Sequence, residues 1–197
     1  MLLLSDKMQQ VNLSLVFVGS SGSGKSSLVQ RFMYPSTKPN VFETIAIDVY
    51  SNMIRIGEKL YSVRIWDTAG KDYYENLYEK YITQTDCCIV VYDTTDIQSW
   101  RRMKKWMRTI KDYDARVPIC IVGNKIDKES LRRVKRADVH DYVRHCGISN
   151  VIYSECSAST GENCRETYEL IVNYSKKPCK EVWRNREYVE GKGCCIV

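Results

Sequence analysis

Short apolar runs alternate with segments of helical periodicity along most of this 197-residue chain. Runs rich in Val, Ile and Leu are typical of buried strands, whereas apolar residues repeated every three or four positions predict helices. The predicted strands are residues 13–18, 46–56, 59–66, 87–92, 119–122 and 151–154, and the predicted helices are residues 25–33, 99–113, 137–146 and 164–175. Only Gly57 and Glu58 separate the second and third strands, which predicts a hairpin there.

This alternation predicts an α/β fold with a mostly parallel, six-stranded sheet and helices on both faces. Ligands of such sheets bind beyond the carboxyl ends of the strands. We expect one domain over residues 1–177, followed by a flexible polar tail over residues 178–197. No apolar run approaches the roughly 20 residues of a membrane-spanning helix.

The charge and the cysteines exclude several classes of protein. A net charge of +6 is a mild excess, and its basic clusters at residues 101–108 and 132–136 lie on predicted helices, where charge runs are usually solvated. No motif of a nucleic-acid-binding fold accompanies them, so we expect no nucleic-acid partner. Nine cysteines without a secretory signal indicate reduced thiols in a cytosolic protein.

A phosphate-binding loop follows the first predicted strand. Residues 19–26 match the pattern G-x-x-x-x-G-K-[ST] and open the first predicted helix, which is the context that the motif requires. Lys25 is expected to reach the β- and γ-phosphates, and the Ser26 hydroxyl is expected to bind Mg²⁺, while backbone N–H groups surround the phosphates. The predicted phosphate-binding residues are Gly19, Ser21, Gly22, Ser23, Gly24, Lys25, Ser26 and Ser27.

Two further motifs at strand ends indicate that the base is guanine. Asn124, Lys125 and Asp127 form an N-K-x-D motif after the fifth strand, and Ser157-Ala158 follows the sixth. The Asp127 carboxylate can accept hydrogen bonds from N1–H and the exocyclic amine of guanine, and adenine offers neither group there. A buried carboxylate left unpaired by adenine gives strong discrimination. The Ala158 N–H is expected to donate to the guanine 6-oxygen.

Three residues predict a site that senses the γ-phosphate. Asp67 begins a D-T-A-G motif after the third strand and is expected to hold Mg²⁺ through a water molecule. The Gly70 N–H is expected to meet the γ-phosphate, and the Thr44 hydroxyl to complete the Mg²⁺ ligands only when that phosphate is present. Loops held in this way are ordered in the triphosphate form and released afterwards.

These motifs resemble those of the Ras-superfamily small GTPases, and the chain is most similar to the Rab branch. The resemblance covers about residues 13–176, and its Rab-like details are Ser21-Gly22, residues 45–49, Trp66 and residues 90–96. It implies a monomeric GTP hydrolase that binds GTP or GDP with Mg²⁺ and meets exchange factors, GTPase-activating proteins and effectors through two switch regions. It also implies that Ile45, Trp66 and Tyr81 face partners; core packing is the alternative for Trp66 and Tyr81.

Three positions depart from the family pattern. Lys71 stands where the family usually has a catalytic Gln; Lys can only donate hydrogen bonds and cannot orient a water molecule as an amide does, which predicts slow intrinsic hydrolysis. Thr37 replaces an aromatic residue that edges the guanine, so that Tyr34 substitutes for it or nucleotide exchange is fast. Val49 replaces an aromatic residue and predicts an unusual choice of effector.

The chain ends in Cys194-Cys195-Ile196-Val197. This end is typical of prenylation, either at Cys194 of a C-a-a-X box or at both cysteines as in Rab proteins. Because one lipid anchors only marginally, we favour two. The protein is then expected on the cytoplasmic face of a membrane, cycling with the cytosol.

Two functions remain open from the sequence. The first is a regulated switch in vesicle trafficking that hydrolyses GTP slowly, and the second is a GTP-bound signalling adaptor with negligible hydrolysis. Lys71 keeps the second open, whereas a metabolic ATPase or kinase is excluded by Asp127 and by the lack of a second substrate domain.

Overall fold

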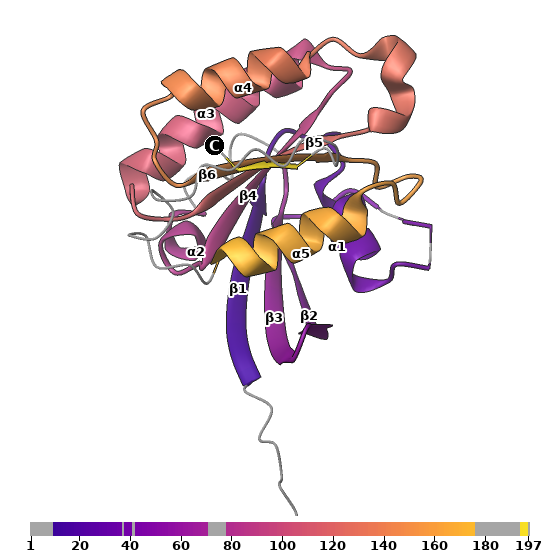
Figure 1. The fold of residues 1–197 in the computed structure, drawn as a ribbon, viewed down its shortest axis with the longest axis vertical. Helices are drawn as coiled ribbons and strands as arrows, with labels where there is room; N and C mark the ends of the chain where they lie inside the picture. The colour runs from indigo at the N-terminus through magenta and orange to yellow at the C-terminus, as the bar shows by residue number, and fades with distance from the viewer. Residues whose placement is uncertain (1–9, 37, 41, 71–77, 176–193, 197) are drawn as a thin grey trace, which may run out of the picture.

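The computed structural model describes residues 10–36, 38–40, 42–70, 78–175 and 194–196. A seven-stranded sheet in the order β2-β3-β1-β4-β5-β6-β7 lies between two layers of helices (Figure 1). The strands are β1 (Gln10–Val18), β2 (Ile47–Ile56), β3 (Lys59–Thr68), β4 (Cys87–Asp93), β5 (Ile119–Asn124), β6 (Val151–Cys156) and β7 (Cys194–Ile196). The helices are α1 (Lys25–Met33), α2 (Glu79–Thr83), α3 (Ile97–Tyr113), the 3-10 helix η2 (Ile126–Leu131), α4 (Arg136–His145) and α5 (Cys164–Ser175).

The predicted α/β fold is confirmed, with every predicted strand and helix present. The six-stranded sheet needs one correction, because Cys194–Ile196 of the tail pairs antiparallel with β6 as a seventh strand. β7 covers the outer edge of β6, and the edge of a sheet is where a further strand can pair. Short α2 and η2 were not predicted, since five or six residues carry too little periodicity to be recognised.

Parallel pairing brings five strand ends to one edge of the sheet. β1 lies between β3 and β4 and is parallel to both, and β5 and β6 continue the parallel order. Only β2 and β7 run antiparallel to their neighbours. The motifs predicted to bind nucleotide follow β1, β3, β5 and β6, so the topology gathers them at the same edge.

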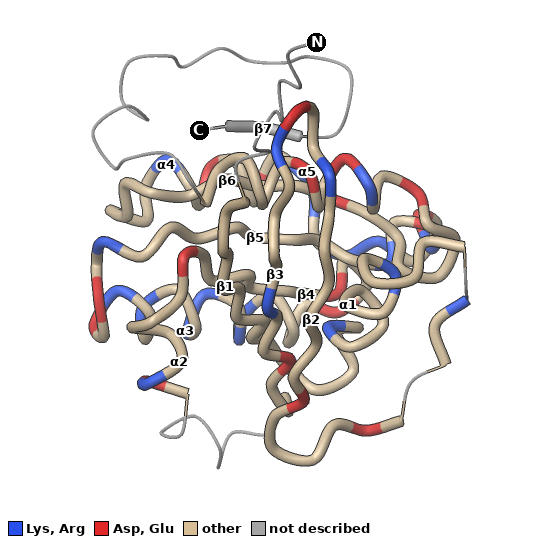
Figure 2. The backbone as a smooth tube through the Cα atoms, turned by 90° about the horizontal axis from the view of Figure 1, so that it is seen from below, with Lys and Arg blue, Asp and Glu red and all other residues tan. Residues whose placement is uncertain are grey.

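Two apolar cores cover the two faces of the sheet. Helices α1 and α5 pack on one face through side chains such as Leu28, Phe32 and Ile171, whereas α2, α3 and α4 pack on the other through Ile82, Met107 and Val139. β5 carries no charge and is tan along its length in Figure 2, as expected for a strand that is covered on both sides. Within the described ranges no helix is long and apolar enough to cross a membrane.

A buried polar network stabilises the sheet edge behind the base motifs. Glu155 on β6 is 1% exposed, and its carboxylate accepts hydrogen bonds from Arg132 Nη1 at 2.9 Å and Arg136 Nε at 2.6 Å. Tyr153 also donates to Glu155 and lies 3.2 Å from the Tyr92 hydroxyl. Burial opposes ionisation of Glu155, yet hydrogen bonds from Arg132, Tyr153 and Arg136 hold its pKa below the ordinary value. The network therefore depends on a buried carboxylate that stays charged.

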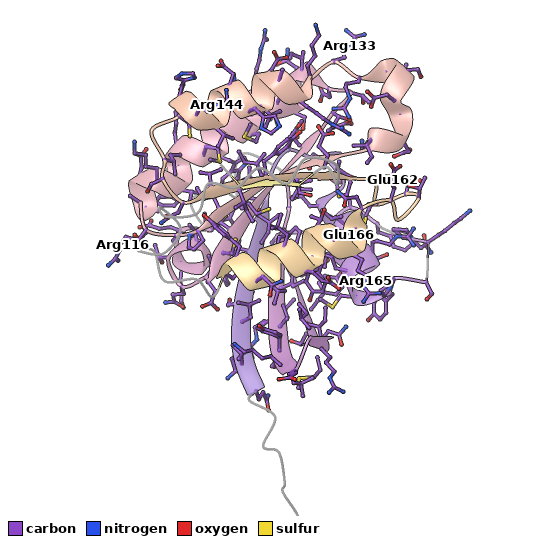
Figure 3. All side chains as sticks on the ribbon, viewed as in Figure 1. Arg116, Arg133, Arg144, Glu162, Arg165 and Glu166 are labelled. Carbon is purple, nitrogen blue, oxygen red and sulfur yellow. The ribbon has the colours of Figure 1, made fainter. Side chains whose placement is uncertain are left out.

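Replacing Arg132 by Met should lower the free energy of unfolding by about 3 kcal/mol, measured by urea titration at pH 7. The value lies at the low end for a broken buried pair, because Arg136 still binds the stranded carboxylate. The matched control is Arg165→Met on α5, labelled in Figure 3, whose side chain is 86% exposed and should leave stability unchanged. An Arg132→Met protein as stable as the wild type would contradict the role given to the network.

The pH dependence of this loss has a definite sign. Because the folded-state pKa of Glu155 lies below its ordinary value of 4.5, the carboxylate contributes stability above pH 4.5 and loses it as the pH falls through the folded-state pKa. The difference in unfolding free energy between wild type and Arg132→Met should therefore be full at neutral pH and shrink in acid. A difference that grows in acid would contradict this assignment.

Candidate functional site

Residues 19–26 curl between the end of β1 and the start of α1. Gly24 has φ +88°, and a Cβ there would lie 2.2 Å from Asn124 Nδ2. Gly19 has φ +141°, and its Cβ would lie 2.2 Å from the Val91 carbonyl oxygen. Glycine is thus required at both positions, by backbone conformation and by close approach. Ser23 is also buried within this loop.

Lys25 places its ammonium group inside the curl. The side chain is 5% exposed, and Nζ donates to the carbonyl oxygens of Gly19 at 3.0 Å and Ser20 at 3.1 Å. Burial lowers the pKa of Lys25 to about 8, and the charge of Asp67 opposes that shift. An ammonium has three donors, so two bonds to carbonyls leave one for an anion such as a phosphate.

Three predicted metal ligands meet beside this lysine. Ser26 Oγ and Thr44 Oγ1 are 2.9 Å apart, and Thr44 Oγ1 donates to Asp67 Oδ2 at 3.4 Å. Asp67 is fully buried, its pKa is raised by that burial, and its Oδ1 has no hydrogen-bond partner among the described residues. An unpartnered buried carboxylate oxygen beside two hydroxyl groups is the donor set of a hard cation. The site therefore fits Mg²⁺.

The loop after β3 presses against the phosphate loop. The Ser21 N–H donates to the Gly70 carbonyl oxygen at 3.1 Å, and a Cβ on Gly70 would lie 2.2 Å from the Ser21 nitrogen. From the sequence, the Gly70 N–H was predicted to meet the γ-phosphate. In the structure, the Gly70 carbonyl oxygen also accepts from the Ser21 N–H, which is one of the donors of the phosphate loop. A phosphate that takes the Ser21 N–H has to displace this carbonyl.

One hollow of about 510 Å³ joins these parts. Most of its lining residues were predicted from the sequence to bind nucleotide or Mg²⁺: Ser21, Gly22, Gly24, Lys25, Ser26, Ser27, Thr44, Gly70 and Lys125. Phe42, Glu43 and Thr68 complete the lining, and the sequence did not single them out. The structure thus brings together the phosphate and metal residues predicted from separate motifs.

Asn124 ties the base motif to the phosphate loop. Its Nδ2 donates to the Ser23 carbonyl at 2.9 Å, and its Oδ1 accepts from the N–H groups of Lys125 at 2.8 Å and Ala158 at 3.0 Å. The Ala158 N–H, which was predicted to meet the guanine 6-oxygen, is therefore shared with Asn124. A single amide side chain sets the relative positions of three loops.

Lys125 and Asp127 are held by different partners. Lys125 Nζ donates to the Gly22 carbonyl at 2.7 Å and pairs with Asp93 Oδ2 at 2.6 Å. Ser157 Oγ donates to Asp127 Oδ1 at 2.6 Å. The sequence missed Asp93, although its place at the end of β4 was a usable signal.

The Asp127 carboxylate was expected to be buried beneath a bound base, and in this structure Asp127 is exposed. It lies in η2 on the protein surface, where only Ser157 is seen to bond it among the described residues. Any desolvation that makes adenine costly must therefore come from the bound base itself. The predicted selectivity then depends on how closely the base covers this carboxylate.

The predicted partner-facing residues divide into two groups. Ile45 is 82% exposed, as expected for a contact residue. Trp66 and Tyr81 are half-buried, lie 4.8 Å apart between ring centroids and pack against the core beneath α2 and α3. Core packing therefore accounts for part of both aromatic rings. Lys71 and Thr37, and the side chains of Cys194 and Cys195, lie outside the described residues.

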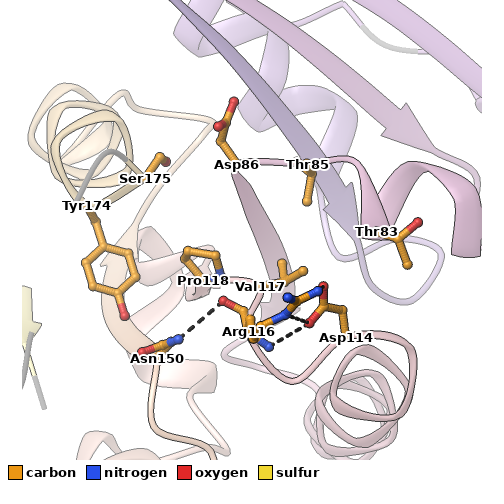
Figure 4. Close-up of a pocket in the computed structure, with 10 residues that line it drawn as sticks. All are labelled: Thr83, Thr85, Asp86, Asp114, Arg116, Val117, Pro118, Asn150, Tyr174 and Ser175. Atoms are coloured by element: carbon orange, nitrogen blue, oxygen red, sulfur yellow. Dashed lines mark hydrogen bonds and ion pairs between the residues drawn. The ribbon is translucent and has the colours of Figure 1, made fainter. Parts of the chain in front are cut away.

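A second hollow of about 380 Å³ opens at the opposite edge of the sheet, where β4 and β5 begin (Figure 4). Asp114 and Arg116 in its wall pair with each other at 2.9 Å, and Arg116 is 86% exposed. Asn150 Nδ2 donates to the Arg116 carbonyl at 3.3 Å. This hollow contains none of the residues predicted to bind nucleotide.

Replacing Asn124 by Ala should lower the free energy of unfolding by about 3 kcal/mol even without added ligand. The change removes three hydrogen bonds in a buried position, and each contributes about 1 kcal/mol. Thermal and urea unfolding would measure it, with Asn52→Ala on exposed β2 as the matched control. Equal stability of the two variants would show that Asn124 does not join the loops.

Comparison with known proteins agrees with this site. The Ras family model matches residues 14–177. Human EF-hand calcium-binding domain-containing protein 4B is 30% identical over 186 residues, which cover 92% of this chain. They cover 25% of that protein, so the chain spans about a quarter of the length of this curated relative. The chain belongs to the Ras family of small GTPases, switch proteins that bind GTP and GDP and generally require Mg²⁺.

Proposed function

We propose that the protein is a Rab-like, membrane-anchored small GTPase that regulates vesicle trafficking. The observation that carries the switch is the meeting of Ser26, Thr44 and Asp67 beside buried Lys25. Thr44 belongs to the segment between α1 and β2, so a ligand bound at this point controls where that segment lies. The Rab-like sequence details and the cysteine pair at the C-terminus support the finer assignment.

Each residue of the site has a part in this proposal. The phosphate-loop N–H groups and Lys25 bind the phosphates, and Ser26, Thr44 and Asp67 hold Mg²⁺, Asp67 through water. The ion supplies positive charge that offsets the charge of the phosphates. Asn124 and Lys125 fix the loops around the base, and the Asp127 carboxylate selects guanine.

An exposed apolar stripe supports partner binding beside this switch. Phe42 is 85% exposed, Ile45 82%, Val49 52% and Met53 47%, and they extend from the Thr44 segment along edge strand β2. Large apolar side chains that are exposed along an edge strand and the segment before it favour a protein interaction site. A partner seated there would sense the position of Thr44. Exchange factors, activating proteins and effectors are the partners that we propose.

The GTP-bound adaptor is the second candidate, and Lys71 is the residue that favours it. A lysine ammonium donates hydrogen bonds but accepts none, so it cannot align an attacking water molecule as a glutamine amide does. It can instead stabilise the γ-phosphate of bound GTP. In both candidates nucleotide binding is the same and the hydrolysis rate differs.

Purified protein loaded with GTP and Mg²⁺ should convert it slowly to GDP over hours, and Lys71→Gln should convert it faster by about tenfold or more. The rate should rise because a glutamine amide can orient the attacking water molecule, and a positioned group of this kind contributes at least this much to the rate. Chromatography of the released nucleotide measures both rates in single turnover. Lys71→Ala is the matched control, because it removes the ammonium without supplying an amide.

Each outcome of this experiment selects one reading. Persistent GTP in the wild type, with hydrolysis restored by Lys71→Gln, would favour the adaptor. Equal rates in all three proteins would show that the side chain at position 71 does not set the hydrolysis rate. Failure to retain any guanine nucleotide would refute the proposed function as a whole.

The membrane anchor is tested through Cys194 and Cys195. Full-length protein made in eukaryotic cells should pellet with membranes, and the double variant Cys194→Ser, Cys195→Ser should be soluble. Each single variant should partition between the two fractions, because one lipid chain anchors only weakly. Cys146→Ser on the G domain is the control, and membrane binding that survives the double substitution would contradict the anchor.

A further inference from the structure

Arg31 is a buried arginine on the inner side of α1, in its last turn. Only 8% of its surface is exposed. Its guanidinium donates to three backbone carbonyl oxygens: Nε to Ala158 at 3.0 Å, Nη2 to Ser159 at 2.9 Å and Nη1 to Pro35 at 2.9 Å. The rigid planar fork of a guanidinium holds several acceptors in fixed relation, which a lysine cannot do.

The three carbonyls belong to two segments that are far apart in the sequence. Ala158 and Ser159 lie in the loop between β6 and α5, 127 and 128 residues away from Arg31. Pro35 follows the end of α1 and begins the segment that leads to Thr44. Arg31 therefore joins the loop of the base site to the root of the segment that reaches the metal site.

The loop after β6 is braced on its other sides as well. The Ala158 N–H donates to Asn124 Oδ1, and the Gly161 N–H donates to the Ser157 carbonyl at 2.8 Å. Gly161 has φ +89°, and a Cβ there would lie 3.7 Å from the Arg31 guanidinium carbon. Arg31 donates to the Ala158 carbonyl oxygen, while Asn124 accepts from the Ala158 N–H. Both backbone polar groups of Ala158 are therefore held.

The geometry points to Arg31 as a positioning residue that aims the Ala158 N–H at the 6-oxygen of guanine and ties this loop to the Thr44 segment. This inference rests on the guanine site of the proposed function. A donor that is fixed before the ligand arrives binds more tightly, because less ordering is required on binding. Arg31 contributes to affinity and base selectivity without touching the nucleotide.

The test compares two diphosphates that differ at the base. Affinities for GDP and for 6-thioguanosine diphosphate are measured by competition with fluorescent GDP in the presence of Mg²⁺. The analogue keeps the N1–H and the 2-amino group that Asp127 is expected to bind, but it has sulfur, a weak acceptor, in place of the 6-oxygen. Arg31→Met should weaken GDP by about tenfold or more, since buried carbonyls lose their partners and the donor loses its aim. Binding of the analogue should weaken by less than about threefold, because its sulfur accepts only weakly from the Ala158 N–H.

Two further variants separate positioning from folding. Ile110→Ala removes a fully buried side chain of α3 in the core on the other face of the sheet, so it should lower the unfolding temperature and leave the ratio of the two affinities unchanged. Arg31→Lys keeps the charge but not the planar fork, and it should give an intermediate ratio. If Arg31→Met does not fold, Arg31→Lys decides the question.

The results that would overturn the inference are definite. Equal loss of affinity for both diphosphates in Arg31→Met would reduce Arg31 to a general stabiliser of the fold. A wild-type ratio in Arg31→Lys would show that the fork is not needed. Wild-type protein that binds no GDP would instead overturn the guanine site, which is a different failure.

Discussion

Parallel pairing of β1 with both β3 and β4 is the constraint on which the site depends. It forces successive strands to end at one edge, where the chain must leave the sheet in loops. Each loop arrives with a few polar groups, and none of them alone would bind a nucleotide. Their effect comes from convergence: Lys25 after β1, Asp67 near the end of β3 and Asn124 at the end of β5 reach the same edge of the sheet because the strands end there.

The polar groups at this edge are held by one another. Asn124 fixes three loops, Asp93 holds Lys125, and Arg31 clamps the loop after β6. The sites of phosphate, metal and base recognition are therefore parts of one hydrogen-bonded assembly. Among the described residues, Asp67 Oδ1 has no hydrogen-bond partner and Lys25 Nζ donates to two carbonyl oxygens, which leaves one donor; both point to the ligands that the Ras family binds.

Local patterns made much of this structure predictable. Apolar runs gave the strands, and the spacing of glycines, Lys25 and Ser26 gave the phosphate loop together with the helix that follows it. What escaped prediction depends on distant partners. β7 pairs with the outer edge of β6, and two of the three acceptors of Arg31 lie 127 and 128 residues along the chain. Exposure of Asp127 also escaped, since burial depends on what covers a residue and not on its own sequence context.

The bond from the Ser21 N–H to the Gly70 oxygen makes the chain its own competitor for the phosphate loop. Such a competitor is tethered, so its effective concentration is fixed by chain geometry and does not change with dilution. Phosphate binding exchanges one hydrogen bond for another, and the affinity reports only the difference between them. The contact with Gly70 therefore lowers the apparent affinity of the loop for phosphate by a constant factor that is set within the molecule.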